Sequence, residues 1–145
     1  MAHKIVVGLD GQSSGAKALD YAQNMAKQMG VCELLVVYVI EWSPFSFQTA
    51  EENAERHKRR EEEITVAKER VVEPALKQLK DVGLTATGVV RHGHVADALD
   101  AIAKEHQADQ IVVGRSTEGG MTARIFGSST ANLVMNASVP VTVIA

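Results

Sequence analysis

Short apolar runs alternate with longer segments of helical periodicity along the chain. Five runs are predicted to be strands, several of them because apolar, β-branched residues occupy successive positions. These runs are residues 4–9, 33–40, 86–91, 110–114 and 140–145. Successive apolar positions indicate strands that are buried on both faces, as in a parallel sheet covered by helices. The alternation therefore predicts an α/β fold, an open five-stranded parallel sheet with helices on both faces and right-handed crossovers.

Helices are predicted where apolar residues recur every three or four positions. Residues 13–29 form one such helix, and Gly30 is placed to end it in a left-handed conformation. Its predicted apolar face consists of Ala18, Leu19, Ala22, Met25, Ala26 and Met29. A second helix is predicted over residues 95–106, with Val95, Leu99, Ile102 and Ala103 on its apolar face. The last helix is expected to begin near Gly127, to bury Leu133 and Val134, and to end before Pro140.

Residues 51–80 are also helical in pattern, but their first half is dense in charge of both signs, such as Glu55 with Arg59. A solvated helix face and a charged arm that docks a partner both fit this half. Pro74 is expected to kink or split the helix. The preceding loop, residues 41–50, contains three aromatic side chains and fits either a lid or a segment packed under the charged helix.

Length and composition restrict the class of protein. A chain of 145 residues predicts a single domain over residues 1–145. The net charge of −3 gives no basis for non-specific nucleic-acid binding, which needs a clustered basic face. The single cysteine, Cys32, cannot form an internal disulfide, and we interpret it as a small buried apolar residue. With no secretory signal and no apolar stretch of about 18 residues, the expected location is the cytoplasm, without direct membrane insertion.

Several catalytic and binding motifs are absent from the sequence. There is no Gly-Lys-Ser/Thr of a P-loop, and GxGxxG does not follow the first strand. There is likewise no HExxH motif. His92 and His94 could be a metal pair, but with no third ligand at suitable spacing they are better interpreted as two turn histidines. No nucleophile–base pair is evident, so no catalytic residue is predicted.

The remaining chemistry lies after the first and fourth predicted strands. Asp10 follows the first strand and precedes a turn rich in glycine and serine. The segment GRSTEGGMTARIFGSST, residues 114–130, follows the fourth strand and leads into the last helix. Ligands bind at the carboxyl ends of such strands, and the free N–H groups of a helix N-terminus favour an anion. Arg115 and Arg124 could add positive charge. The segment therefore fits either a surface loop or a phosphate-binding site.

The same residues resemble the universal stress protein (UspA) family. In its nucleotide-binding branch the pattern is Gly-x-x-Gly, nine residues, then Gly-Ser/Thr. Here Gly114 holds the first position, Thr117 stands where the second glycine is expected, and Gly127-Ser128 close the pattern. The segments KIVVGLDGQSSGAKAL, GHVADALDAIAKEHQADQIVVG and SVPVTVI resemble the rest of the family's chain. The resemblance implies the adenine nucleotide α hydrolase-like fold, a Rossmann-like sandwich.

The resemblance also implies a site for ATP, with Mg²⁺ beside the phosphates and the metal ligands unknown. Asp10 would border the adenine and ribose, and the backbone near Val39 would meet the adenine edge. The residues implied around the ribose and phosphates are Gly114, Arg115, Ser116, Gly120, Gly127, Ser128 and Ser129. Thr117 either strains the loop, if a positive φ is needed there, or offers its hydroxyl to a phosphate.

Three functions follow as hypotheses. The first is an ATP-binding regulatory protein of the stress response, whose occupancy biases conformation or assembly. The second is a slow ATPase, and the third is a nucleotide-free dimeric scaffold. The chain ends within its last strand, so an uncovered edge predicts a homodimer through that strand, with a tetramer left open. The resemblance further implies a membrane transporter as a partner whose activity the protein regulates.

Overall fold

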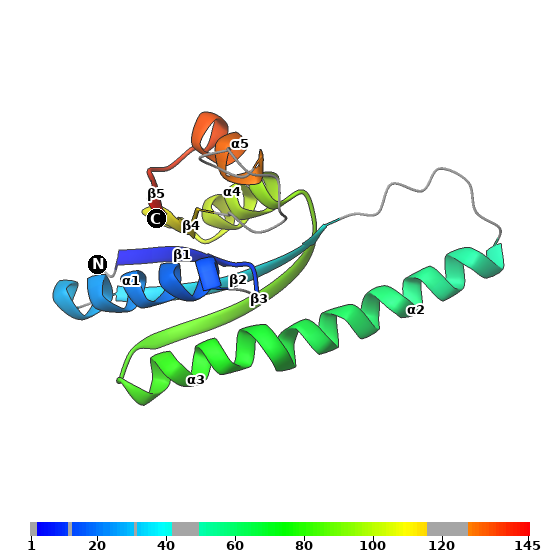
Figure 1. Cartoon of the computed structure of the whole chain (residues 1–145), viewed down its shortest axis with the longest axis horizontal. Coiled ribbons are helices and arrows are strands. Elements are labelled where there is room, and N and C mark those ends of the chain that lie inside the picture. The colour runs from blue at the N-terminus through cyan, green and yellow to red at the C-terminus, as the bar shows by residue number, and fades with distance from the viewer. Residues whose placement is uncertain (1–2, 12, 31, 42–49, 116–127) are drawn as a thin grey trace.

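The computed structural model describes residues 3–11, 13–30, 32–41, 50–115 and 128–145 (Figure 1). Over this part of the chain, no helix combines the length and the apolar content that crossing a membrane requires. The side chains at positions 13, 50–53, 56, 128 and 129 lie outside the description, although their backbone belongs to helices.

All five predicted strands are present in one parallel sheet. They are β1 (His3–Leu9), β2 (Cys32–Glu41), β3 (Thr85–Gly93), β4 (Gln110–Gly114) and β5 (Val141–Ile144). The strand order is β3-β2-β1-β4-β5, and every neighbouring pair is parallel. β1 therefore lies at the centre of the sheet, and β3 and β5 are its edges. The predicted α/β fold is confirmed, with strand boundaries that shift by no more than two residues.

Helices cover both faces of the sheet, because successive residues of each strand point to opposite sides. On one face, Ile5 and Val7 of β1 pack with α1 (Ser13–Met29) and α3 (Glu73–Asp81). On the other face, Val6 packs with α4 (Val95–Glu105) and α5 (Ser128–Asn136). Both faces of the central strand are thus buried, which explains its unbroken apolar run.

Two residues assigned to apolar helix faces are exposed instead. Met29 is 39% exposed, because it is the last residue of α1, where the helix reaches the amino ends of the strands. Val134 is 50% exposed, whereas Leu133 beside it is 2% exposed. Successive residues of a helix point about 100° apart, so in the short helix α5 Leu133 faces the sheet and Val134 faces away. Gly30 ends α1 with a φ of +80°, as predicted.

The charged helical region is one rod made of α2 (Ala50–Ala67), a π-helical turn η1 (Lys68–Val72) and α3 (Figure 1). Pro74 stands in the first turn of α3 and neither breaks nor splits the rod, because the backbone at Ala67, Val72 and Glu73 keeps right-handed helical angles. The wider π turn directly precedes the proline. Because its hydrogen bonds span five residues, as from the Glu73 N–H to the Lys68 carbonyl, it accommodates the donor that proline lacks.

Candidate functional site

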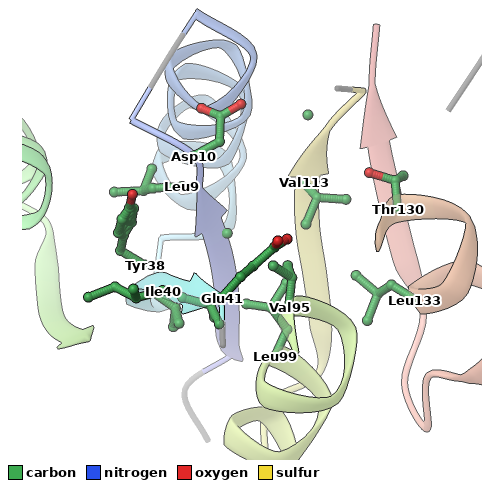
Figure 2. A pocket seen from close by; sticks show the side chains of 14 residues that line it. Leu9, Asp10, Tyr38, Ile40, Glu41, Val95, Leu99, Val113, Thr130 and Leu133 are labelled. Carbon is green, nitrogen blue, oxygen red and sulfur yellow. The ribbon is translucent and has the colours of Figure 1, made fainter. Parts of the chain in front are cut away.

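A cavity of about 310 Å³ lies at the carboxyl ends of β1, β2 and β4 (Figure 2). Side chains from the helices of one face close it from the other side: Val95 and Leu99 of α4, with Thr130 and Leu133 of α5. The volume is at the lower end of the range typical of small-molecule sites. The cavity is therefore large enough for part of a ligand such as a nucleoside.

The position of the cavity follows from the order of the strands. The chain passes from β1 outward through β2 to β3, and then returns to the other side of β1 as β4. Connections leave β1 and β4 in opposite directions, so a crevice opens above these two strands. Gly8 of β1 with Val113 and Gly114 of β4 lines this crevice. Ligands of open α/β sheets bind at this switch in strand order.

β2 extends beyond its neighbour at the edge of the cavity. Its pairing with β1 ends at Leu9 and Tyr38, whereas its pairing with β3 continues to Glu41. Within the described strands, Val39, Ile40 and Glu41 therefore have no β1 partner, and all three line the cavity. This overhang presents backbone polar groups to the cavity, at the place where the backbone near Val39 is predicted to meet an adenine edge.

Asp10 lines the cavity and also stabilises the start of α1. Its Oδ1 accepts a hydrogen bond from the Gly15 N–H at 2.9 Å, and its Oδ2 accepts one from the Ser14 hydroxyl. The Gly15 N–H belongs to the first turn of α1, where N–H groups lack helical partners and a negative charge is favourable. Asp10 thus has a structural role in addition to its place at the cavity.

Gly114 lies in close contact with the backbone of α1. A β-carbon on Gly114 would overlap the Ser14 carbonyl, so only glycine fits at the end of β4. The next residue, Arg115, donates its backbone N–H to the Ile144 carbonyl at 2.7 Å and so continues the pairing with β5. The Arg115 side chain is half-buried and does not line the cavity. Gly114 and Arg115 were both predicted to lie near the ribose and phosphates. Gly114 borders the cavity, whereas the Arg115 side chain lies outside its described lining.

The rest of the predicted phosphate site is only partly described. Ser116, Thr117, Gly120 and Gly127 fall outside the described residues. Ser128 and Ser129 are the first two residues of α5, close to the expected beginning of this helix. The roles of these six positions remain predictions.

Two polar residues of the cavity were not predicted from the sequence, Thr130 and Glu41. Thr130 lies in the first turn of α5, and Glu41 extends across the cavity toward Val95 (Figure 2). The sequence carried one indication of Glu41, since it stands two positions after Val39 and strand residues two apart share a face. The indication for Thr130 was weaker: it is the last of the hydroxyl residues in the segment 114–130. In the described lining, the ionisable groups are Asp10, Glu41 and the phenol of Tyr38, and no basic side chain is present.

His92 and His94 are not part of the described lining of this cavity. His92 belongs to β3 rather than to the following turn, and its Nε2 lies 3.3 Å from Glu63 Oε2 of α2. His94 is the residue that precedes α4. The part of the chain that the structure describes contains no group of three or more His, Cys, Asp or Glu side chains suited to a metal ion.

Comparison with known proteins identifies relatives over the whole length. The model of the universal stress protein family matches residues 1–145. Universal stress protein MJ0531 of Methanocaldococcus jannaschii is 28% identical over 145 residues, which cover 97% of this chain and 81% of that protein.

Solved structures have the same fold at lower sequence identity. UspA from Lactobacillus plantarum superposes with a TM-score of 0.83 at 21% identity, covering 99% of this chain and 97% of its own. A universal stress protein in complex with cAMP superposes with a TM-score of 0.67 at 23% identity, and the match covers 99% of this chain and 96% of that chain. A universal stress protein from Archaeoglobus fulgidus in complex with dAMP superposes with a TM-score of 0.63 at 21% identity, and the match covers 100% of this chain and 98% of that chain.

Proposed function

The chain belongs to the universal stress protein family, and we propose that it is a regulatory protein that binds ATP or a closely related adenine nucleotide in the cavity above β1, β2 and β4. The observation that carries the proposal is the cavity itself, located at the switch in strand order and bordered by a glycine, Gly114, that no other residue can replace without overlap. A close backbone approach of this kind is a common feature of nucleotide sites in α/β sheets.

The chemistry of the described lining suits the nucleoside part of such a ligand. Val95, Leu99 and Leu133 provide an apolar surface for a flat base. Asp10 and Glu41 are carboxylates, which accept hydrogen bonds from the hydroxyls of a ribose and the amino group of a base. The two carboxylates of the described lining disfavour a phosphate inside the cavity, because like charges repel.

The phosphates would extend from the cavity toward the beginning of α5. The first N–H groups of a helix have no partner within the helix, and the positive end of its dipole favours anions. Ser128 and Ser129 are the first residues of this nine-residue helix. We place the phosphates there, with Gly127 and the preceding segment as further predicted contacts.

Two relatives support adenine as the base. One universal stress protein has been solved with cAMP and another with dAMP. Both ligands contain adenine and a phosphate, and both proteins share the fold of this chain. Adenine at the β2 overhang is therefore the base that we propose here.

Mg²⁺ would bind mainly to the phosphates and to water. This ion is commonly held by substrate phosphates and only one or two carboxylates, so it does not need a cluster of acidic side chains. ATP affinity that falls several-fold on adding a chelator, while the affinity for adenosine stays the same, would support a bound metal. Equal ATP affinity with and without the chelator would argue against it.

Isothermal titration calorimetry with adenosine, AMP, ATP and GTP tests the proposal. We expect ATP and AMP to bind and GTP to bind more weakly. Ligand at about 100 times its dissociation constant should stabilise the fold by roughly 2.7 kcal/mol, which is measurable as an increase in melting temperature. Absence of binding for all four compounds, with no nucleotide released from the purified protein on denaturation, would favour the nucleotide-free scaffold. Phosphate release from ATP at high protein concentration would identify the slow ATPase.

We propose further that nucleotide occupancy tunes assembly through β5. Among the described strands, β5 pairs only with β4, so its outer edge is available to a second copy. Occupancy changes assembly only if the nucleotide binds one oligomeric state more tightly than another. Sedimentation with and without ATP measures this difference. A transporter partner can be sought by capture from a membrane fraction with and without ATP.

A further inference from the structure

A groove of about 440 Å³ lies between the α2–η1–α3 rod and the carboxyl end of β2. Val39 of β2 packs on the face of the sheet that α4 covers. Because successive strand residues alternate between the faces, Tyr38 and Ile40 point to the other face, where they line the groove. The rod supplies the opposite wall, from Arg59 of α2 to Val71 of η1. We call the space between these two walls the rod groove.

The rod groove opens where the rod separates from the sheet. Val72 of η1 is 3% exposed and packs so closely on β3 that a β-carbon on Gly88 would overlap it. Val66 of α2 is 46% exposed, and α2 continues beyond the strands (Figure 1). Between them and the start of α2, the Glu63 carboxylate meets His92 Nε2 of β3 at 3.3 Å. An apolar side chain of the rod is therefore left exposed within the groove.

The floor of the rod groove is apolar, and its two ends are basic. Tyr38, Ile40 and Val66 contribute to the floor. Arg59 and Arg70 mark the ends, with exposed side chains that form no ion pair or hydrogen bond with the described groups. They are eleven positions apart on a continuous rod, so at about 1.5 Å per residue they stand roughly 16 Å apart. The groove is thus elongated rather than round.

Two carboxylates in the described lining reduce the positive charge at one end only. Glu62 stands three positions after Arg59, where opposite charges on a helix attract each other. Glu63 is already engaged by His92. Arg70 is seven positions from Glu63, at the far end of the lining. The end of the groove at η1 therefore offers a guanidinium group beside an apolar surface.

We propose that the rod groove docks a short segment of a partner protein that combines apolar side chains with a carboxylate placed against Arg70. A guanidinium holds a carboxylate through two parallel hydrogen bonds, and apolar side chains of the segment would cover Val66 and Tyr38. An extended segment of about five residues spans roughly 16 Å, the length of the groove. The charged half of the rod then acts as an arm that docks a partner.

The rod groove shares a wall with the proposed nucleotide cavity. Tyr38 and Ile40 line both. Val71 forms a second link, because a β-carbon on Gly11, the residue after Asp10, would lie 3.6 Å from it. A nucleotide that shifts either link changes the affinity for the partner segment, and the segment changes the affinity for the nucleotide by the same factor. This coupling rests on the proposed function and extends it to the partner.

Selection from a library of short random peptides on the full chain tests the docking. The enriched peptides should combine Asp or Glu with apolar residues, and one of them, carrying a fluorophore, serves as the probe in anisotropy titrations. Arg70→Glu should weaken its binding about tenfold or more, and Arg70→Lys, which keeps the charge without the paired donors, about threefold. Val66→Glu adds a carboxylate to the groove and should also weaken binding about tenfold, which keeps the proposal testable if R70E does not fold.

Lys58→Glu is the matched control, because Lys58 is exposed on α2 and is not part of the groove lining. It changes the net charge as much as R70E does, so its affinity for the peptide should stay within about twofold of the wild type. Binding that is equal in R70E, V66E and the wild type, or weakened equally by K58E, would overturn the inference. A selection that enriches no acidic, apolar peptide would also overturn it, as expected if residues 42–49 of this chain or a second copy fill the groove.

Measurements with AMP separate the docking from the nucleotide site. R70E should bind AMP as the wild type does, because Arg70 is not part of the described lining of the nucleotide cavity. Saturating AMP should change the affinity for the probe peptide several-fold, and saturating peptide should change the AMP affinity by the same factor. Equal peptide affinity with and without AMP would overturn the coupling. A wild-type protein that binds the peptide but no adenine nucleotide would remove the proposed function and the coupling, and leave the docking in place.

Discussion

Gly114 at the end of β4 lies against the Ser14 carbonyl at the beginning of α1, closely enough that a β-carbon on Gly114 would overlap it. Ser14 in turn donates its hydroxyl to Asp10, the residue that follows β1. These two contacts join β4, α1 and the end of β1 beside the cavity. A change at Gly114 is expected to move all three.

Gly114→Ala should separate the end of β4 from α1. We expect a loss of roughly 1–3 kcal/mol in the free energy of unfolding, as for other overpacked sites, together with weaker binding of AMP. Urea unfolding and calorimetry measure the two effects.

Gly30→Ala is the matched control for this glycine substitution. A β-carbon on Gly30 meets no atom within 4 Å, but the φ of +80° makes alanine unfavourable there by about 1–2 kcal/mol. This variant should lose stability and keep its AMP affinity. If G114A binds AMP as well as G30A does, the close contact at Gly114 does not shape the site.

The outer edge of β5 predicts a specific effect of proline. The Pro140 carbonyl accepts a hydrogen bond from Ile111 of β4, and the Ile144 carbonyl accepts one from Arg115, directly after β4. The backbone of Thr142 therefore also faces β4, and that of Val143 faces the outer edge. Val143→Pro removes an N–H from the outer edge only. We expect it to convert a homodimer into a folded monomer in sedimentation analysis.

Thr142→Pro is the comparison for the edge experiment. It removes an N–H that faces β4, so we expect loss of stability rather than a stable monomer. A wild-type protein that sediments as a monomer at micromolar concentration, or a V143P protein that remains dimeric, would contradict pairing through β5.

Asp100 should make the protein less stable in acid. Burial alone would raise the pKa of Asp100, but hydrogen bonds from the N–H and hydroxyl of Ser138 and from Lys104 outweigh burial and hold it below its ordinary value. Because the folded pKa lies below the unfolded one, about 3.9, this stabilisation is complete above that pH and is lost as the pH falls through the folded pKa.

Asp100→Asn tests this dependence. The variant should be roughly 1 kcal/mol less stable than the wild type at pH 7, because an amide accepts weaker hydrogen bonds than a carboxylate. The difference should shrink as the pH falls below about 4. Asp81→Asn, at the exposed end of α3, should change stability by less than about 0.5 kcal/mol. A difference between D100N and wild type that is constant from pH 7 to pH 3 would refute the assignment.

Cys32 should resist alkylation in the folded protein. Its exposed fraction is 8%, and burial raises the pKa of its thiol, with further increases from the nearby Asp109 and Glu33 carboxylates. The thiolate is the reactive form, so little of it is available at neutral pH. Iodoacetamide should label the thiol only after urea unfolding, as seen by mass spectrometry. Thr87→Cys in a Cys32→Ser background should label at once, and equally fast labelling of native Cys32 would contradict its burial.

Much of the fold could be predicted from the sequence because local periodicity reports local geometry. The apolar run around Val6 and Val7 identified β1, and the glycine at position 30 identified the end of α1. Val134 shows the limit of the method. Its pattern matched that of Leu133, but which of two adjacent apolar residues faces the sheet depends on how the helix packs.

The candidate site was predictable in part. Asp10, Val39 and Gly114 line the cavity, since each stands at the carboxyl end of a predicted strand, and their contact with a ligand stays a prediction. Arg115 was expected near the ligand, and its side chain lies outside the cavity lining because the residue continues the pairing with β5. Thr130 and Glu41 were missed, because neither belongs to a motif and they come from elements almost 90 residues apart.

The sequence by itself determined the elements of this protein, its family and the glycines and acidic residue that mark one edge of the sheet. These follow from side-chain size, polarity and backbone freedom, which act over a few residues. The tertiary structure decided which strands are neighbours, how far β2 extends past β1, and that Thr130 of α5 lines the cavity. Such relations depend on pairing and packing between distant segments, whose energies no local pattern contains.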